Sequence, residues 1–200
     1  MSDVIDRDRP RVVVAHHSGW GHTAALAEAV ADGARLADAT ATTLAVDHIT
    51  EEQWALLDEA DAIVFGSPTY MGNVSAGFQT FAELTSRRCA TGAWRDKVAA
   101  GFVNSGSKSG DKLQTLMSLA VFAAQHHMHW VNLGLGPGWN STTGSEQDLN
   151  RLGFFLGAGA QTDTDVSAAH VHKSDLLTCR HLGSRVAGVA AQLLAGRAAA

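Results

Sequence analysis

The sequence predicts a doubly wound α/β domain built on a five-stranded parallel sheet. Strand-like and helix-like segments alternate along the chain, as in consecutive βαβ units. The strongest strand-like segments are continuous apolar runs such as VVVA, AIVFG and VAAGFV, which is typical of strands buried on both faces of a parallel sheet. The chain has 200 residues, 46% of them hydrophobic, which is enough for one domain with a full core and short for two.

The first part of the chain supplies two strands and two helices. The β-branched run Arg11–His16 predicts a buried strand. Apolar residues at spacings of three and four predict a helix over residues 23–37. A weaker strand is predicted over residues 41–46. A short helix follows at Glu51–Glu59, with Thr50 as its N-cap.

The middle of the chain repeats this alternation. Residues 61–66 and 97–103 are predicted to be strong strands, and residues 75–86 and 111–126 amphipathic helices. Right-handed crossovers between parallel strands then place helices on both faces of the sheet.

The last part of the chain breaks the rhythm. Residues 129–133 predict the fifth strand and residues 174–194 a closing helix. Residues 134–172 are rich in Gly, Ser and Thr and too long for an ordinary loop, so we interpret them as a functional insertion. Residues 1–10 have no apolar core of a signal peptide and are expected to be a disordered leader to a single domain at 11–200. We expect the flavodoxin-like strand order.

Composition argues against several classes of function. The net charge is -5 and no basic block occurs, which argues against a nucleic-acid-binding face. No apolar stretch approaches the about 20 residues of a membrane span. Cys89 and Cys179 form no metal or redox motif, so we expect free thiols in a reducing cytoplasm. The ten histidines show no spacing typical of metal ligands, and no metal site is predicted.

The turn after the first strand has the features of a phosphate cradle. Residues 17–23 read HSGWGHT and lead into a helix, whose N-terminal amides and positive dipole end attract anions. Ser18 and Thr23 add hydroxyl groups. A Walker loop is excluded because its Gly-Lys-Ser/Thr motif is absent. The pattern Gly-x-Gly-x-x-Ala also fits a permissive dinucleotide fingerprint, and a capped structural turn is a further alternative.

Two more polar turns follow strands at the same sheet edge. Residues 67–75 (SPTYMGNVS) present flat or soft apolar surface at Tyr70 and Met71, on a curled loop that could border a planar heterocycle or form a turn before an N-cap at Ser75. Residues 104–111 form a second Gly- and Ser-rich loop. Ligands of open parallel sheets bind outside the carboxyl ends of the strands, so the three turns predict one site.

These motifs resemble a known family. SGWGHT at residues 18–23, GSPTYMGNVS at 66–75 and SGS at 105–107 resemble the flavodoxin-like NAD(P)H:quinone oxidoreductases of the tryptophan-repressor-binding-protein type, within the NADPH-dependent FMN reductase group. The resemblance runs from about residue 11 to 133 and resumes weakly near residue 190.

The resemblance implies an enzyme that holds FMN without a covalent bond. It would transfer two electrons from NAD(P)H to a quinone-like acceptor, and no side chain would act as a catalytic residue because the flavin carries the chemistry. Family members commonly form dimers or tetramers, so a homodimer or homotetramer is expected. The alternative is a flavodoxin-type electron carrier that binds FMN without turning over a small molecule. The mild net charge favours the enzyme.

The resemblance also assigns cofactor-binding residues, with the phosphate on the first turn and the isoalloxazine ring on the other two. They are Ser18, Trp20, Gly21, His22, Thr23, Pro68, Thr69, Tyr70, Met71, Gly72, Asn73, Ser105, Gly106, Ser107, Lys108, Ser109, Gly110 and Gln125.

The chain departs from the family pattern in three places. Gln125 stands where the family has a histidine that touches the flavin. The tryptophan that caps the family's substrate pocket falls near Cys89, so Trp94 or Trp139 would have to replace it. The insertion before the third strand, which helps family members assemble, is short here.

Overall fold

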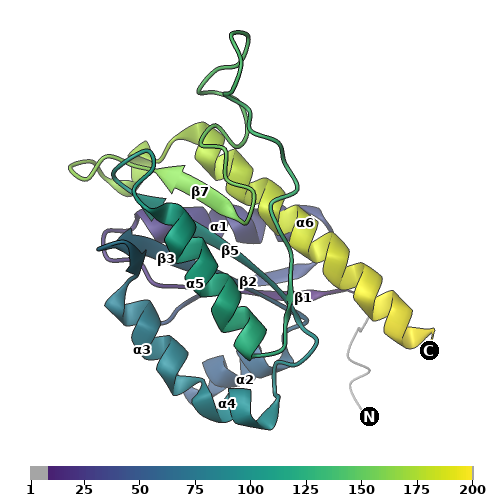
Figure 1. The fold of residues 1–200 in the computed structure, drawn as a ribbon. Helices are drawn as coiled ribbons and strands as arrows, with labels where there is room; N and C mark the ends of the chain where they lie inside the picture. The colour runs from purple at the N-terminus through teal and green to yellow at the C-terminus, as the bar shows by residue number, and fades with distance from the viewer. Residues whose placement is uncertain (1–8, 200) are drawn as a thin grey trace.

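Strands and helices alternate through residues 9–199, the part of the chain that the computed structural model describes (Figure 1). The strands are β1 (Arg11–His16), β2 (Thr40–Ala45), β3 (Ala62–Tyr70), β4 (Asn73–Val74), β5 (Val98–Ser105), β6 (His129–Trp130) and β7 (Ala158–Gln161). The helices are α1 (His22–Leu36), α2 (Glu51–Glu59), α3 (Ala76–Leu84), α4 (Ser86–Thr91), α5 (Lys112–Gln125), the 3₁₀ helix η1 (Ala168–His170) and α6 (Lys173–Ala198). The predicted leader lies outside the described residues, except for its last two.

Parallel pairing joins the sheet in the order β2-β1-β3-β5, with β6 and β7 both beside the far edge of β5. This is the predicted flavodoxin-like order of five positions, with the fifth divided between two short strands. The order reverses between β1 and β3, so the ligand-binding switch point lies at their carboxyl ends.

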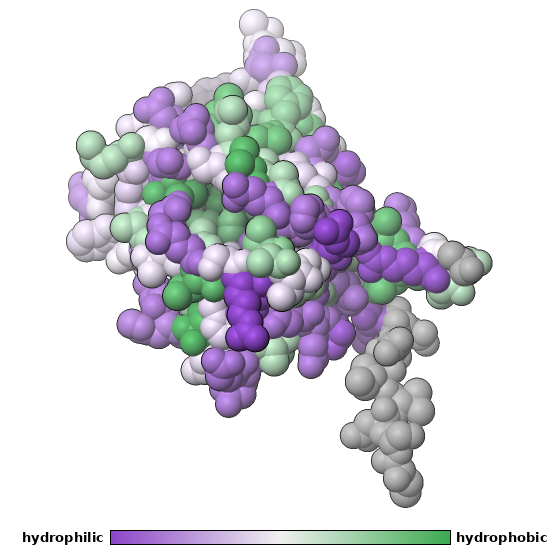
Figure 2. Space-filling view, turned by 60° about the horizontal axis from the view of Figure 1, so that its bottom comes forward, coloured by the Kyte–Doolittle hydropathy of each residue, from purple (hydrophilic) through white to green (hydrophobic). Residues whose placement is uncertain are grey.

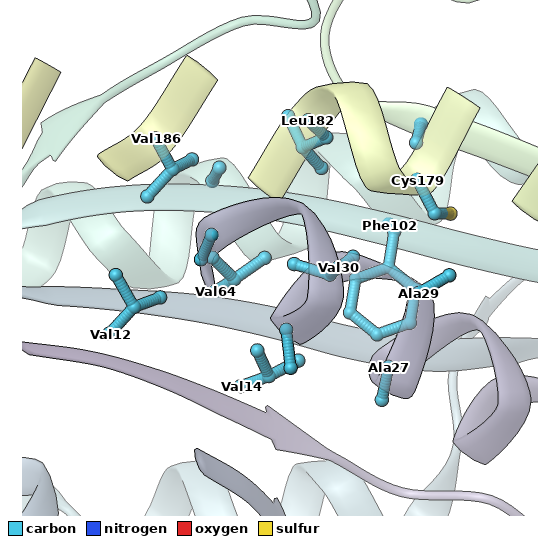
Figure 3. Close-up of a cluster of buried hydrophobic side chains, with 14 of the residues drawn as sticks. Val12, Val14, Ala27, Ala29, Val30, Val64, Phe102, Cys179, Leu182 and Val186 are labelled. Atoms are coloured by element: carbon cyan, nitrogen blue, oxygen red, sulfur yellow. The ribbon is translucent and has the colours of Figure 1, made fainter. Parts of the chain in front are cut away.

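Two apolar layers hold helices on the two faces of the sheet. On one face, the inward side chains of the strands pack against α1 and α6; Figure 3 shows Val12, Val64 and Phe102 meeting Val30 and Leu182. The other face packs against α2, α3 and α5. Burial of these side chains, at about 25 cal/mol per Å² of apolar surface, is the main term that stabilises the sandwich.

Glycine sets how closely α1 and α6 approach each other. A Cβ atom on Gly33 would collide with the backbone of Arg180, and one on Gly183 with the backbone of Val30. The two helices therefore pack backbone to backbone, which no larger side chain would allow.

The strand predicted to end at Gly66 continues to Tyr70. Its ladder with β5 extends as far as Pro68, and β4 then folds back on its end to form a hairpin. Met71 and Gly72 make the two-residue turn with φ angles of 49° and 80°, the positive pair of a type I′ turn. The expected curled loop at residues 67–75 is therefore a strand extension with a tight hairpin.

The predicted fifth strand is also shorter than expected. Only His129 and Trp130 pair as strand with β5, after which the chain rises into the protruding loop at the top of Figure 1 and returns as β7 (Figure 1). β7 takes the same sheet edge beside the carboxyl half of β5, from Phe102 to Ser105. The predicted insertion at residues 134–172 thus contains a strand of the sheet.

On the face drawn in Figure 2, apolar residues occur in small groups between hydrophilic ones. None of the helices that the structure describes has the length and apolarity needed to cross a membrane. Among residues 9–199, no cluster of three or more His, Cys, Asp or Glu side chains could hold a metal ion.

Candidate functional site

A cleft of about 260 Å³ opens at the carboxyl ends of β1, β3 and β5, and we call it the inner cleft. It lies at the switch point of the sheet, where the topology places a ligand. Its lining residues are Ser18, Gly19, Trp20, His22, Thr23, Pro68, Thr69, Tyr70, Asn104, Ser105, Gly106, Thr162 and Thr164. The three predicted turns therefore meet at one place.

The turn after β1 leaves helix amides free for an anion. Gly21 is the N-cap of α1 with φ 84°, a left-handed conformation that favours glycine, and it gives no side-chain cap. The first-turn amides of His22 and Thr23 have no carbonyl within the helix to accept their hydrogen bonds. Ser18 Oγ accepts from Ala24 N at 3.1 Å. The first turn holds no acidic residue, so it can receive a phosphate.

Two aromatic side chains flank the inner cleft. Trp20 is 78% exposed and Tyr70 is 40% exposed. A Cβ atom on Gly19 would lie 2.5 Å from Tyr70 Oη, so glycine is what lets the tyrosine lie against this turn. Burial raises the pKa of Tyr70, which keeps its hydroxyl protonated as a donor. Flat rings at such positions can stack on a planar heterocycle.

A chain of hydrogen bonds fixes the β1 turn to the hairpin. Asp47 Oδ1 lies 3.2 Å from His17 Nε2, and His17 Nδ1 lies 2.8 Å from Ser75 Oγ. This is the connectivity of a Ser-His-Asp hydrolase, but Ser75 is 1% exposed. Its Oγ also accepts from Phe78 N as the N-cap of α3, and Ser75 N donates to Ser67 Oγ. The chain of bonds is therefore structural and does not reach a substrate.

The predicted insertion supplies a fourth wall that the sequence did not reveal. Residues 162–166 follow β7 and lie beside the β5 turn, where Thr162 N donates to the carbonyl of Ser105 at 3.2 Å, and Thr162 and Thr164 line the inner cleft. Gln161 Nε2 donates to the carbonyl of Gly106 at 3.0 Å and ties this segment to the β5 turn. The only hint in the sequence was the length and polar composition of the insertion.

A buried ion pair holds the fourth wall in place. Arg151 Nη2 and Asp175 Oδ2 lie 2.8 Å apart, and both side chains are almost wholly buried. Asp175 also accepts from the backbone N of Gln161, whose carbonyl accepts from Arg151. The pair therefore joins the insertion, β7 and the start of α6.

His22 connects the first turn to the fourth wall. Its Nε2 donates to the carbonyl of Val166 at 2.8 Å, which leaves only Nδ1 for a ligand. The expected hydrogen bond from His22 to a phosphate is thus limited to one ring nitrogen. The His22 side chain therefore links the start of α1 to residues 162–166 by a hydrogen bond.

A second, wider space of about 630 Å³ continues the inner cleft, and we call it the outer pocket. The two spaces share Thr69, Ser105, Gly106 and Thr164. The remaining residues of the outer pocket are Met71, Gly72, Ser107, Gly110, Asp111, Asp163 and Asp165. Among these, the three aspartates were not predicted.

Four predicted residues lie close to these spaces without lining them. Gly21 and Ser109 are neighbours of lining residues. Asn73 sits behind the hairpin turn, where its Oδ1 accepts from Ser118 Oγ at 2.7 Å. Lys108 Nζ lies 5.3 Å from the ring centre of Trp139, a cation–π contact with the insertion.

Gln125 lies far from the cleft. It ends α5, whose 14 residues span about 20 Å from the cleft edge at 1.5 Å per residue. There it lines a groove of about 850 Å³ between α3 and α5, beside Cys89. Trp94, one expected replacement for the capping tryptophan, is wholly buried in the core and donates to Asp58. Within one chain, neither residue reaches the cleft.

The sequence profile of the NADPH-dependent FMN reductases matches residues 12–135, more than half of the chain. The chain belongs to this family. The match covers the sheet through β6 and all three predicted turns. It confirms the resemblance inferred from the motifs.

Individual relatives cover nearly the whole chain. Flavodoxin FldP of Pseudomonas aeruginosa is 42% identical over 186 residues, and an NAD(P)H dehydrogenase (quinone) of Archaeoglobus fulgidus is 31% identical over 205; each match covers 92% of this chain and 98% of the relative. A solved flavodoxin, WrbA-like protein from Agrobacterium tumefaciens is 41% identical, with a TM-score of 0.74, and the match covers 92% of this chain and 98% of that one. The flavodoxin-like fold is thus confirmed.

Proposed function

We propose that this protein is an FMN-dependent oxidoreductase that transfers two electrons from NAD(P)H to a quinone-like acceptor. The outer pocket is the observation that carries this proposal. An electron carrier needs only an exposed flavin edge, whereas a reductase needs room beside the flavin for a second small molecule. The inner cleft is smaller than the about 300–1,000 Å³ of most ligand pockets, and the outer pocket of about 630 Å³ extends it.

The residues of the inner cleft fit FMN. The free amides of His22 and Thr23, with the Thr23 hydroxyl, would hold the phosphate at the N-terminus of α1. Trp20 and Tyr70 would flank the ring system, and the β5 turn would border its polar edge. When bound, FMN would accept a hydride from the nicotinamide and pass two electrons to the acceptor, whose second proton comes from solvent.

The chain's own residues would position the reactants and exclude water. Thr69 and Thr164 line both spaces, so they would lie between the cofactor and the second small molecule. The fourth wall lies beside the β5 turn and is joined to the β1 turn through His22 and Val166. Holding the nicotinamide and the flavin face to face is the main contribution that such a site can make.

The electron-carrier alternative is supported by one relative. Flavodoxin FldP is 42% identical over nearly the full length of both chains. On this alternative, FMN would bind in the same cleft and the outer pocket would stay free of small substrates.

Titration and steady-state assays separate the two functions. We expect apoprotein titrated with FMN to bind about one FMN per chain, and the loaded protein to oxidise NADH or NADPH with benzoquinone in parallel double-reciprocal lines. Failure to bind FMN would reject both functions. FMN binding without NAD(P)H oxidation would leave the electron carrier, and intersecting lines would reject a shared site.

Assembly and compartment belong to the same proposal. We expect a homodimer or homotetramer, measurable by light scattering after size-exclusion chromatography. Leu84, Met117 and Val121 are exposed apolar side chains that an assembly could cover. A reducing cytoplasm fits the two free cysteines of the chain.

A further inference from the structure

Lys112 is a fully buried lysine at the edge of the candidate site. It is the first residue of α5, its side chain is 0% exposed, and it lies beneath the β5–α5 loop, residues 106–111. Its Nζ donates to the carbonyls of Ser107 at 2.5 Å, Lys108 at 3.0 Å and Ser109 at 3.3 Å. All three hydrogen bonds of the ammonium group thus go to backbone oxygens of one loop.

These three bonds fix the direction of the loop amides. In a planar trans peptide the C=O and the following N–H point in opposite directions. Because the carbonyls of Ser107, Lys108 and Ser109 point at Nζ, the amides of Lys108, Ser109 and Gly110 point away from it. Ser107 and Gly110 of the same loop line the outer pocket, so the loop borders the candidate site. Successive amides turned to one side form a nest that attracts negative charge.

We propose that Lys112 is a positioning residue for the flavin site, which holds the β5–α5 loop with its amides turned outward and places a buried positive charge behind them. This inference rests on the proposed function. A flavin gains negative charge on two-electron reduction, so a cation and a nest of amides on one edge bind the reduced form more tightly than the oxidised form.

Lys112 takes part in no ion pair with the residues that the structure describes. Asp175 and Arg151, the charged groups that affect its pKa, are paired with each other. Burial lowers the pKa of Lys112 to about 8, so the ammonium form still dominates at neutral pH. Lys173, the first residue of α6, is exposed, lines neither the inner cleft nor the outer pocket, and carries a charge that is screened by water and salt. Lys173 therefore provides a control.

The experiment compares Lys112→Met with Lys173→Met, since each removes one positive charge. The first measurement is hydrogen exchange in the apoprotein at the amides of Lys112 and Gln114, which donate to the carbonyls of Ser109 and Asp111 and so report opening of the loop. We expect Lys112→Met to speed this exchange at least tenfold and Lys173→Met to leave it unchanged. The measurement requires no flavin, so it tests the loop even if the proposed function fails.

The second measurement is the affinity of each variant for oxidised and for reduced FMN. We expect Lys112→Met to lose about tenfold more affinity for reduced than for oxidised FMN. This ratio is a fall of about 30 mV in the two-electron midpoint potential of the bound flavin. Lys112→Gln keeps a hydrogen-bond donor without charge and should lower the ratio while keeping more of the loop protection. It also carries the test if Lys112→Met does not fold.

Two results would overturn the inference. Unchanged exchange in both Lys112 variants would show that the lysine does not order the loop. An equal loss of affinity for reduced and oxidised FMN, or the same change in Lys173→Met, would show that the buried charge has no special effect on the flavin. If no variant and not even the parent binds FMN, the proposed function fails, whereas the exchange result still decides the role of Lys112 in the loop.

Discussion

The two sides of the inner cleft are held by different forces. One side, which we call the strand-turn wall, consists of the turns that directly follow β1, β3 and β5. The other side is the fourth wall, residues 162–166 after β7. Because it belongs to the insertion, we call it the insertion wall from here on. The strand-turn wall is fixed by backbone and hydroxyl hydrogen bonds, including the chain from His17 to Ser75. The insertion wall depends on the buried pair of Arg151 and Asp175.

This difference shows how such a site is completed. Any parallel sheet brings the turns after its strands to one edge, so the strand-turn wall is a consequence of topology. The topology of the sheet does not fix the position of the insertion wall. Its hydrogen bond from Gln161 to Gly106 joins residues 55 positions apart in the chain. A buried charge pair, which is costly to break, fixes a segment that the sheet itself does not position.

The largest expected effect comes from breaking the insertion wall. Arg151→Met leaves Asp175 buried without its partner, so the free energy of unfolding should fall by about 3–5 kcal/mol. Replacing both residues, Arg151→Met with Asp175→Leu, should recover most of this loss because neither charge of the pair is then left buried without its partner. Urea denaturation measures each value.

The control for this prediction is Arg9→Met, which breaks the exposed ion pair with Asp38 and should change stability by less than about 1 kcal/mol. If Arg151→Met were as stable as the parent, the buried pair would not hold the insertion wall.

The second-largest expected effect is a pH dependence of the free energy of unfolding, caused by a histidine that lies outside both walls. His126 is buried at the far end of α5, with Nδ1 unpaired and Nε2 bonded to Thr85. Burial, with a smaller effect of His127, lowers its pKa to about 4. Between pH 6.5 and 4 the histidine is therefore protonated in the unfolded chain but not in the folded one. The free energy of unfolding should fall by up to about 3 kcal/mol from pH 6.5 to 4.

Unfolding measured across this pH range tests the effect. His126→Gln should flatten much of the slope, while His48→Gln, an exposed control, should leave it intact. Burial also lowers the pKa of His16, which accounts for a residual slope of the same sign. A slope that His126→Gln does not change would contradict the assignment.

The strand-turn wall can be tested through its phosphate turn. Thr23→Ala removes one hydroxyl from the inner cleft, and a hydrogen bond to a charged group contributes about 1.5–3 kcal/mol, so FMN affinity should fall about 10- to 100-fold. Gly21→Val should weaken binding more, because φ is 84° there and a β-branched residue is strained in that region. Calorimetric titration measures the FMN affinity of both variants. Thr80→Ala, which changes an exposed threonine of α3, is the control. If Gly21→Val folds and binds FMN as tightly as the parent, the turn after β1 is not the phosphate site.

The smallest expected effect lies where the two walls touch. A Cβ atom on Gly106 would lie 2.7 Å from Thr164 Cγ2, so Gly106→Ala should push the walls apart and weaken FMN binding about fivefold, or about 1 kcal/mol. Thr164→Ser removes that methyl group, and the double variant should regain the lost affinity. If the double variant bound no better than Gly106→Ala, the contact would not set the width of the cleft.

The sequence by itself determined the sheet and one wall of the site. Apolar runs such as VVVA show which segments are buried strands, and the helices between them require parallel pairing and therefore a common carboxyl edge. The positions of Ser18, Thr23 and Tyr70 at that edge follow from chain order alone. Periodicity and turn chemistry are local properties, which is why they could be read directly.

Only the tertiary structure showed where the insertion wall lies and which side chains line the cleft. The sequence gives no local signal that β7 completes the fifth strand, that Thr162 lines the same cleft as Thr23, or that Arg151 pairs with Asp175. These facts depend on contacts between residues far apart in the chain, and such contacts form only when the complete core brings the segments together.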